Sequence, residues 1–422
     1  MRSLFSISLS LLIAITSFAA DPTATKFSAA DCQGSLKPYT APTKGYAYPD
    51  TLAPVFINHV GRHGSRFPAS ATHCKLLLEA LESAKTQGTI TARGKELLAL
   101  VQSVMEVVNG QWGALDDLGV SEQRGIAARM CSRYPSLFKE KRVEAISSYS
   151  PRCVMSMFSF THQLTRMNNT IELSTASGRG KSLLMRPFDV EMSYKDFIEL
   201  GTWKEPYQQH VDRVVPTSAL ERVLGKDYNY GETNPKDLAI VEYYVIAGMS
   251  AMEMECDASR YFTNDEYNAL WSCFNLRQYL QRTSSTLSSV PADIASPLLC
   301  DIIESTDSVV ARKGNSIVGA KLRFGHAETI MPLLSLMRLK GCYYKTNYFD
   351  TVAKNWQDFN VVPMSANIQF ILFKTKGGNF YLRIDRNEEP IAFIPNSTEI
   401  YVPWEKARQY LSNCVPLYYQ TW

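Results

Sequence analysis

The sequence predicts an α/β fold, in which a central, mostly parallel sheet is flanked by helices and carries an inserted, mostly helical lid domain. Three apolar, β-rich segments, residues 55–60, 143–149 and 317–324, predict buried strands, and a polar loop or helix start follows each. The stretch between the second and third strands shows helical periodicity and few strand signals. We therefore expect a signal peptide (1–20), a discontinuous α/β domain (21–154 and 307–422) and the inserted helical domain (155–306).

Further elements are expected around these strands. The apolar positions of residues 73–85 and 91–108 predict two amphipathic helices, which we expect to return over the sheet. A third helix is expected over residues 115–130, where an aspartate can cap its start. Residues 370–375 and 379–385 flank a Lys-Gly-Gly turn and predict a β-hairpin that completes the sheet.

The first twenty residues have the pattern of a secretory signal peptide. Arg2 supplies a positive start, residues 4–15 form an apolar run, and Ser-Phe-Ala at 17–19 offers the small residues at which a signal peptidase cleaves. An uncleaved membrane anchor is the alternative, but the run is short for a membrane span and no later stretch is long enough. We expect an exported protein, periplasmic or secreted, that is free of the membrane after signal removal.

Composition narrows the class of protein further. The 422 residues, 45% of them hydrophobic, can bury a substantial core. A net charge of +3 does not indicate a nucleic-acid partner, but it is compatible with a small anionic substrate. Nine cysteines in an exported chain predict disulfides and, because the count is odd, at least one free thiol; Cys256 with Cys273 is a local pairing to consider. No cysteine or histidine spacing typical of zinc occurs, so we expect no metal site, and we expect a monomer.

The first strand runs into a loop that carries one imidazole between two guanidiniums. Arg62 and Arg66 present planar forks that fit phosphate oxygens in pairs. His63 lies between these cations and should stay neutral, and a neutral imidazole that faces a held phosphate is a nucleophile. Gly61 and Gly64 lack a Cβ and would let the backbone approach a ligand closely. The loop therefore predicts a phosphoryl-transfer site.

The full loop sequence, Arg62-His-Gly-Ser-Arg-Phe-Pro68, resembles the Arg-His-Gly-x-Arg-x-Pro signature of the histidine acid phosphatases. A bare Arg-His-Gly triplet would be weak evidence, whereas the seven-residue form directly after an apolar strand is specific. The resemblance implies a histidine phosphatase-like fold and hydrolysis of phosphomonoesters through a phosphohistidine on His63. It implies no cofactor and no metal.

The second strand delivers Arg152 at its carboxyl end, where open α/β sheets place their sites. An arbitrary arginine at a helix start more often forms a surface ion pair. In the family that the loop resembles, however, a segment like this one carries a further phosphate-binding arginine. We therefore expect Arg152 to be the third guanidinium of the site.

The third strand leads into Gly-His-Ala-Glu at residues 325–328, which opens a helix. The positive end of the helix dipole favours anions such as phosphate there, and His326 can donate to a phosphate oxygen. Glu328 is placed to protonate the leaving alkoxide as a general acid, which requires burial or a nearby phosphate to raise its pKa. A lone His-Ala-Glu is most often an ordinary helix cap; its place after a strand in this chain favours the acid role.

The His-Ala-Glu tripeptide narrows the resemblance within the family. Most phytases and acid phosphatases of this group carry His-Asp there, whereas His-Ala-Glu resembles the multiple inositol polyphosphate phosphatases. That resemblance implies phytate and related inositol phosphates as substrates. In the insertion, Arg179, Lys181 and Arg186 form a basic, glycine-containing stretch. A solvated basic loop is the plainer interpretation, and contact with the distal phosphates of the substrate is the sharper one.

Two rival functions stay open. A broad-specificity acid or sugar phosphatase of the same family would use the same residues on other phosphomonoesters. An exported anion-binding protein without catalysis would keep the loop but has no need of a nucleophile and an acid. The remaining histidines other than those of the motifs are expected to be structural: His59, His73, His162 and His210.

Overall fold

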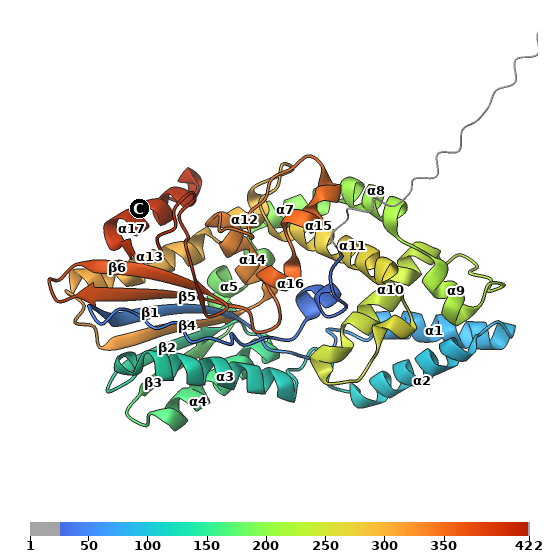
Figure 1. Ribbon diagram of the computed structural model, residues 1–422, viewed down its shortest axis with the longest axis horizontal. Helices are drawn as coiled ribbons and strands as arrows, with labels where there is room; N and C mark the ends of the chain where they lie inside the picture. The colour runs from blue at the N-terminus through green and yellow to red at the C-terminus, as the bar shows by residue number, and fades with distance from the viewer. Residues whose placement is uncertain (1–25, 421–422) are drawn as a thin grey trace, which may run out of the picture.

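The structure, a computed structural model, describes residues 26–420, so the predicted signal peptide lies outside the described residues. Its core is one mixed sheet, whose strands run horizontally in Figure 1; the strand order is β3-β2-β4-β1-β5-β6-β7, with β8 beside β6. The bounds of the strands are β1 Leu52–Arg62, β2 Arg142–Ser147, β3 Glu172–Ser177, β4 Val318–Gly325, β5 Asn367–Thr375, β6 Phe380–Arg386, β7 Glu389–Ile391 and β8 Val402–Pro403.

The sheet has a parallel half and an antiparallel half. Strands β3, β2, β4 and β1 run parallel, while β5 pairs antiparallel with β1 and then with β6. The β5–β6 pair is the predicted hairpin around Lys-Gly-Gly, and this prediction is confirmed. The α/β class with a mostly parallel core is confirmed as well.

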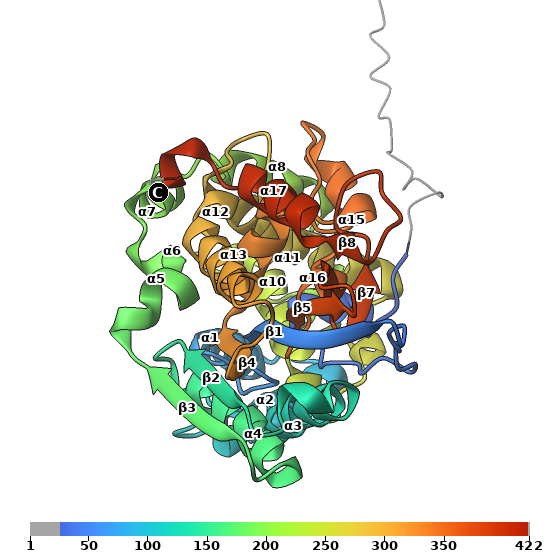
Figure 2. The same ribbon diagram turned by 90° about the vertical axis from the view of Figure 1, so that its left-hand side faces the viewer.

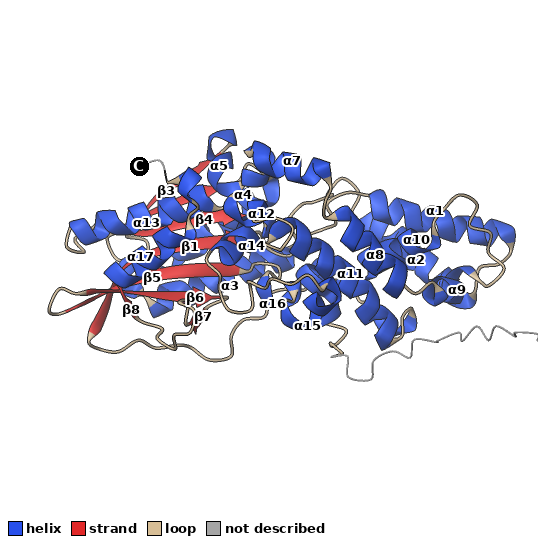
Figure 3. Ribbon diagram, turned by 90° about the horizontal axis from the view of Figure 1, so that it is seen from above, coloured by secondary structure: helices blue, strands red, loops and turns tan. Residues whose placement is uncertain are grey.

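Helices cover both faces of the sheet and form a separate region beyond its carboxyl end (Figure 3). Their bounds are α1 Thr72–Gln87, α2 Ala92–Val107, α3 Asp117–Arg133, α4 Pro151–Met167, α5 Ser182–Met185, α6 Pro187–Val190, α7 Met192–Leu200, α8 Lys204–Val214, α9 Ser218–Leu224, α10 Pro235–Ala247, α11 Asn264–Arg282, α12 Val290–Asp293, α13 Ser296–Ala311, α14 Ala327–Leu336, α15 Val352–Asn355, α16 Asp358–Val361 and α17 Trp404–Cys414.

The pleat of β1 divides its apolar side chains between two cores. Phe56 and Val60 face the core that α13, α14 and α17 share with the sheet, while Ile57 faces the core under α3 and α4. Figure 2 looks along the molecule and shows α3 and α4 on one side of the strands and α13 and α17 on the other. Because both faces are covered, β1 is a nearly continuous run of buried residues.

A third core holds the helical region together, and it differs from the expectation in one respect. Helices α1 and α2 do not return over the sheet; they pack against α10 and α9. Apolar periodicity shows that a helix buries one face, but it does not specify the partner of that face. Residues 155–306 were expected to be mostly helical and separate from the sheet, but they also contribute the strand β3. This strand pairs with β2 although all six of its residues are exposed.

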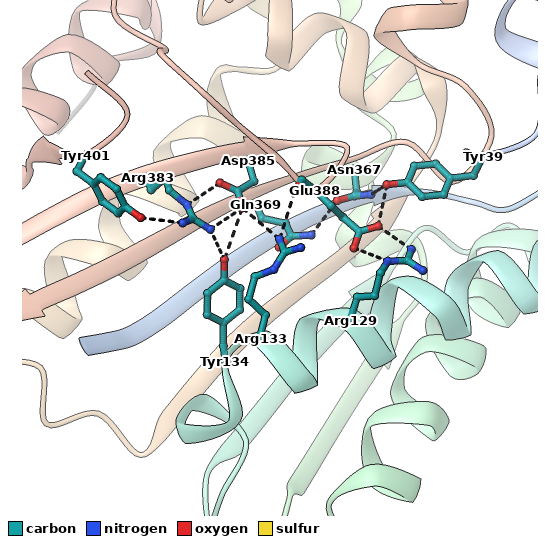
Figure 4. Close-up of polar contacts among 10 residues, drawn as sticks. All are labelled: Tyr39, Arg129, Arg133, Tyr134, Asn367, Gln369, Arg383, Asp385, Glu388 and Tyr401. Carbon is teal, nitrogen blue, oxygen red and sulfur yellow. Dashed lines mark hydrogen bonds and ion pairs between the residues drawn. The ribbon is translucent and has the colours of Figure 1, made fainter. Parts of the chain in front are cut away.

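A buried polar cluster ties the antiparallel half of the sheet to α3 (Figure 4). Arg383, fully buried on β6, donates to both carboxylate oxygens of Asp385 at 2.8 Å and to the Tyr134 hydroxyl. Arg129 of α3 makes a bidentate pair with Glu388 at 2.7 and 2.8 Å. Paired and hydrogen-bonded charges can be buried, so the cluster fixes α3 against the sheet.

All nine cysteines lie within residues 26–420 and are free thiols in the structure, so the expected disulfides are not shown. Cys256 and Cys273 are not bonded to each other; Cys273 is buried and Cys256 half-buried. The number of cysteines carries no information on whether two Cβ atoms meet at bonding distance. Among the helices of residues 26–420, none is long and apolar enough to cross a membrane.

Candidate active site

The three predicted strand ends meet at one edge of the sheet. In the parallel register Arg62 of β1 is opposite Gly325 of β4, and Phe324 is opposite Ser147 of β2. The residues that follow these strands therefore start from neighbouring points. Strand order and register alone thus bring the Arg-His-Gly loop, the start of α4 and the start of α14 together.

His63 is buried in the loop after β1, and its tautomer follows from its hydrogen bond. Its Nδ1 lies 2.9 Å from the carbonyl oxygen of Gly64, which can only accept. Nδ1 therefore carries the proton, and Nε2 keeps its lone pair. Burial, followed by the charges of Arg62 and Arg66, lowers the pKa of His63 well below its usual value, so the predicted neutral imidazole is confirmed.

The Glu122 carboxylate on α3 holds the loop after β1 by hydrogen bonds. Glu122 accepts hydrogen bonds from the backbone N–H and hydroxyl of Ser65, at 2.8 and 2.7 Å, and from the Ser365 hydroxyl at 2.8 Å. The next residue, Gln123, donates to the Arg62 carbonyl at 2.9 Å. Sequence reasoning treated this stretch only as an amphipathic helix; two buried polar residues on its inner face were the available signal.

The two loop glycines serve packing rather than ligand approach, which corrects the expectation for Gly61 and Gly64. A Cβ on Gly64 would lie 2.5 Å from the carbonyl oxygen of Gly119 in α3, and a Cβ on Gly61 would lie 2.6 Å from the His59 ring. Both distances are far below contact distance, so a side chain at either place would displace the loop.

Five arginines line a cavity of about 440 Å³ that His63 also lines, and four of them share one property. The predicted Arg62, Arg66 and Arg152 are joined there by Arg282 of α11. All four have a buried Nε–H group without a hydrogen-bond partner in the described part of the chain. Buried donors are nearly always satisfied, so these four groups mark the site of an absent acceptor.

The charge in the cavity points to the same ligand class. Burial, together with the neighbouring arginines, lowers the pKa of Arg62 to about 10 and of Arg66 to about 9. Each guanidinium is thus destabilised by desolvation and by like charges at close range. A phosphate or a similar oxyanion relieves both effects by supplying negative charge and acceptor oxygens.

His326 caps α14 beside the nucleophile, and its ring centroid lies 5.7 Å from that of His63. Arg152 lies 3.3 Å from its Nδ1, while Ser148 and Arg186 lie 2.9 and 2.8 Å from its Nε2. Burial lowers the pKa of His326 to about 3; the negative charge of Glu328 opposes this shift, and the charges of Arg152 and Arg186 add to it. The ring is therefore neutral above that pH.

Glu328 lies in the first turn of α14 and lines the cavity opposite the loop. Its pKa contradicts the expectation of a raised value. Burial raises the pKa, but Arg282, whose Nη2 lies 3.6 Å from Oε1, and then His326 and Arg62 lower it to about 2. The sequence did not place Arg282 beside this carboxyl, which is why the direction was wrong.

The basic stretch of the insertion does not line the cavity, so the contacts expected of Arg179, Lys181 and Arg186 are not supported by their positions. Arg179 is exposed and lies over the Tyr149 ring. Lys181 is half-buried in the short helix at 179–181. Arg186 pairs with Asp189 at 2.5 Å and its Nη1 lies 2.8 Å from Nε2 of His326; neither Arg186 nor His326 lines the cavity.

The helical region supplies other polar groups to the cavity instead. Arg277, Gln278, Gln281 and Arg282 lie along the last turns of α11, a recurrence of polar residues in an otherwise buried helix. That recurrence was the signal in the sequence. The expectation that His73 is purely structural also changes, because it lines the cavity, and Tyr244 lies stacked on its ring at 4.7 Å. Within residues 26–420, no three His, Cys, Asp or Glu side chains are placed to hold a metal ion.

The fold and the site are those of the histidine phosphatase class. The chain matches the histidine phosphatase superfamily (branch 2) over residues 55–387, and it therefore belongs to that superfamily. It is 25% identical over 398 residues to the Homo sapiens protein named multiple inositol polyphosphate phosphatase 1, with 83% of this chain and 78% of that protein covered. The Gallus gallus protein of the same name is 26% identical over 418 residues, covering 90% and 86%.

Solved structures share the architecture. The Bifidobacterium longum multiple inositol polyphosphate phosphatase in its apo form has a TM-score of 0.79 at 17% identity, with 92% of this chain and 99% of that chain covered. The phytase from D. castellii has a TM-score of 0.71 at 17% identity, with 92% and 85% covered. At these identities the likeness extends to the fold.

Proposed function

We propose that this phosphatase is an exported enzyme that hydrolyses inositol polyphosphates such as phytate through a phosphohistidine on His63, with Glu328 as proton donor. The observation that carries the proposal is the set of unpaired, buried guanidinium donors around a neutral imidazole. A held phosphoryl group would be satisfied by those donors and would lie open to the Nε2 lone pair. Export rests on the signal-peptide pattern of residues 1–20.

In the first step, Nε2 of His63 forms a bond to phosphorus while the bond from phosphorus to the inositol oxygen breaks. Arg62, Arg66 and Arg152 hold the equatorial oxygens, where negative charge spreads in the transition state. The electron pair of the broken bond stays on the inositol oxygen, which takes its proton from Glu328. In the second step, water attacks phosphorus, Glu328 accepts a proton from that water, and His63 regains its lone pair.

The size and charge of the cavity support a polyanionic substrate over a plain monoester. Besides the phosphate-holding arginines, Arg277 and Arg282 extend positive charge along α11. Two crystal structures of the Bifidobacterium longum relative are complexes with inositol hexasulfate and with phosphate. These ligands bind the Bifidobacterium longum protein, and inositol hexasulfate is an analogue of phytate. They therefore support phytate as the first substrate to test with the present protein.

Trapping of the covalent intermediate tests the mechanism. Radiolabelled phytate mixed with the mature protein and quenched rapidly should leave acid-labile, base-stable label on the protein, and His63→Ala should abolish both label and turnover. His162→Ala is the matched control, because His162 is exposed on α4, away from the cavity lining. Turnover by the wild type without any trapped label, or label that persists in His63→Ala, would overturn the mechanism.

A substrate comparison and a chelator test the rest of the proposal. The value of kcat/KM for phytate should exceed that for glucose phosphates; the reverse order would favour a broad sugar phosphatase. Because guanidiniums supply the stabilising charge in this scheme, activity should survive dialysis against a chelator. Loss of activity that added divalent metal restores would contradict the scheme.

A further inference from the structure

Arg282 is the last residue of α11 and reaches across the cavity from the helical region to the sheet domain. Its Nη2 lies 3.6 Å from Oε1 of Glu328, so it forms an ion pair with the carboxyl assigned as proton donor. Arg62, Arg66 and Arg152 make no ion pair with a carboxylate among the described residues, which sets Arg282 apart. Among the described residues that line the cavity, Glu328 is the only carboxyl group, and Arg282 is the arginine that forms an ion pair with it.

A tyrosine of α7 holds the Arg282 side chain in place. Nη1 of Arg282 donates to the hydroxyl of Tyr194, and that hydroxyl donates to the carbonyl oxygen of Gln281 at 3.1 Å. The guanidinium also lies 5.9 Å from the centre of the Tyr194 ring. The Nε–H of Arg282 has no partner in the described part of the chain, so one donor stays available for an incoming ligand.

The ion pair disfavours the protonated carboxyl that Glu328 needs in order to act as proton donor. A proton donor must hold its proton until the leaving oxygen develops charge, whereas a guanidinium at this distance favours the ionised carboxyl. A phosphate group carries more negative charge than a carboxylate and matches the guanidinium fork in a bidentate manner. Substrate is therefore the stronger competitor for Arg282.

We propose that Arg282 is a positioning residue that keeps Glu328 ionised in the empty site and releases it to take up a proton when a substrate phosphate engages the guanidinium. The proposal rests on the proposed function, because it assumes that Glu328 is the donor. The proton comes from solution, and no bond other than that O–H bond forms in this step. Glu328 would thus be protonated, and able to act as general acid, only when substrate is bound.

The surroundings of Glu328 leave Arg282 as its main charged partner. The other titratable groups that face it are Arg62 on β1, Arg66 in the loop, Cys153 on α4 and His326 at the start of α14. His326 is neutral in the working range, and the proposed mechanism assigns Arg62 and Arg66 to the transferred phosphoryl group. Removal of the Arg282 charge should therefore have the largest effect on the protonation of Glu328.

Difference infrared spectroscopy at about pH 5, near the ordinary range of a carboxyl group, reads this protonation directly. Addition of inorganic phosphate to the wild type should produce a protonated-carboxyl band that is absent in Glu328→Gln. In Arg282→Gln the band should already be present without phosphate, and Arg282→Lys should restore the wild-type response. Arg277→Gln is the matched control: it removes a cavity arginine of the same helix and should keep the phosphate-induced band.

Kinetics provide a second readout. For an alkyl phosphate, the alkaline limb of kcat/KM should move up by about one pH unit or more in Arg282→Gln, the size expected for loss of one close opposite charge. For p-nitrophenyl phosphate, whose leaving group needs no proton, the limb should stay in place. Tyr194→Phe should give a smaller shift in the same direction and serves if Arg282→Gln does not fold.

The outcomes separate this inference from the proposed function. If the wild type forms phosphohistidine but Arg282→Gln and Tyr194→Phe both keep the wild-type infrared response and pH profile, the inference is wrong and the function stands. If no phosphohistidine forms, the proposed function itself fails. An unchanged carboxyl band on phosphate binding to the wild type would also overturn the inference.

Discussion

Glu242, in the middle of α10, is a buried carboxyl group without a partner, and its replacement should change how stability depends on pH. Its side chain is 0% exposed, and neither carboxylate oxygen has a hydrogen-bond partner in the described part of the chain. Two charged residues face it, Arg222 on α9 and Glu266 on α11, and these are paired with each other. Burial raises the pKa of Glu242 to about 8 against a smaller lowering by Arg222.

The sign and the size of the effect follow from that pKa. The unfolded chain ionises this carboxyl above its ordinary pKa of 4.5, whereas the folded protein keeps it protonated until about pH 8. The contribution of Glu242 to folding stability is therefore fully present below pH 4.5 and is lost as the pH rises toward 8. At about 1.4 kcal/mol per pH unit, the loss is on the order of 3 to 5 kcal/mol.

Glu242→Gln removes the ionisation and should remove this loss. At about pH 5 the variant and the wild type should have similar free energies of unfolding, because an amide replaces a neutral acid. At about pH 8 the variant should be more stable by roughly 3 kcal/mol. Urea unfolding followed by the fluorescence of the buried Trp271 measures both values.

Glu82→Gln is the matched control, because Glu82 is exposed on α1 in the same helical region. It should leave the difference between the two pH values as it is in the wild type. The reasoning is refuted if Glu242→Gln shows the same loss of stability between the two pH values as the wild type. In that case the carboxyl would be ionised in the folded protein or reached by water.

Three further outcomes are expected. Gly64→Ala should lower kcat tenfold or more, because its Cβ would lie 2.5 Å from the backbone of α3. A tenfold loss corresponds to about 1.4 kcal/mol. The control Gly45→Ala has open space around its Cβ and should leave kcat unchanged in the same assay. Glu328→Gln should slow phytate hydrolysis far more than hydrolysis of p-nitrophenyl phosphate; equal losses would contradict the acid assignment. The double variant Arg179→Ala and Lys181→Ala should leave KM for phytate within about twofold of wild type, since neither lines the cavity; a tenfold rise would restore the original expectation.

The strand–loop junctions could be predicted because each is encoded locally. An apolar, β-branched run followed by glycine and charged residues specifies both the strand and the point at which it ends. Parallel pairing then brings the three ends to one edge without further information. His63 and Glu328 were accordingly expected near each other, and both line one cavity.

The electrostatic state of Glu328 could not be predicted because it depends on a contact between segments distant in sequence. Arg282 stands forty-six residues before Glu328 in the chain, and no local pattern indicates that α11 ends beside α14. The same limit applies to α1, whose apolar face was evident but whose partner α10 was not. Residues that act through tertiary contacts need the fold before their roles can be derived.

Helix α11, which carries two of the cavity arginines, joins two cores, and this has a consequence for the pH dependence of substrate binding. The nucleophile and the phosphate-holding loop rest on the sheet and on α3, while Arg277 and Arg282 lie toward the carboxyl end of α11, where the buried Leu276, Tyr279 and Leu280 belong to the core shared with the sheet. The part of α11 from Tyr267 to Phe274 belongs to the core of the helical region. Glu242 lies on α10, which packs directly against α11. Ionisation of Glu242 in alkaline solution would strain the core around the first half of α11 and so disturb the helix that carries both arginines. Alkaline conditions should therefore weaken substrate binding, seen as a rise in KM for phytate that Glu242→Gln suppresses, while the nucleophile on β1 stays in place.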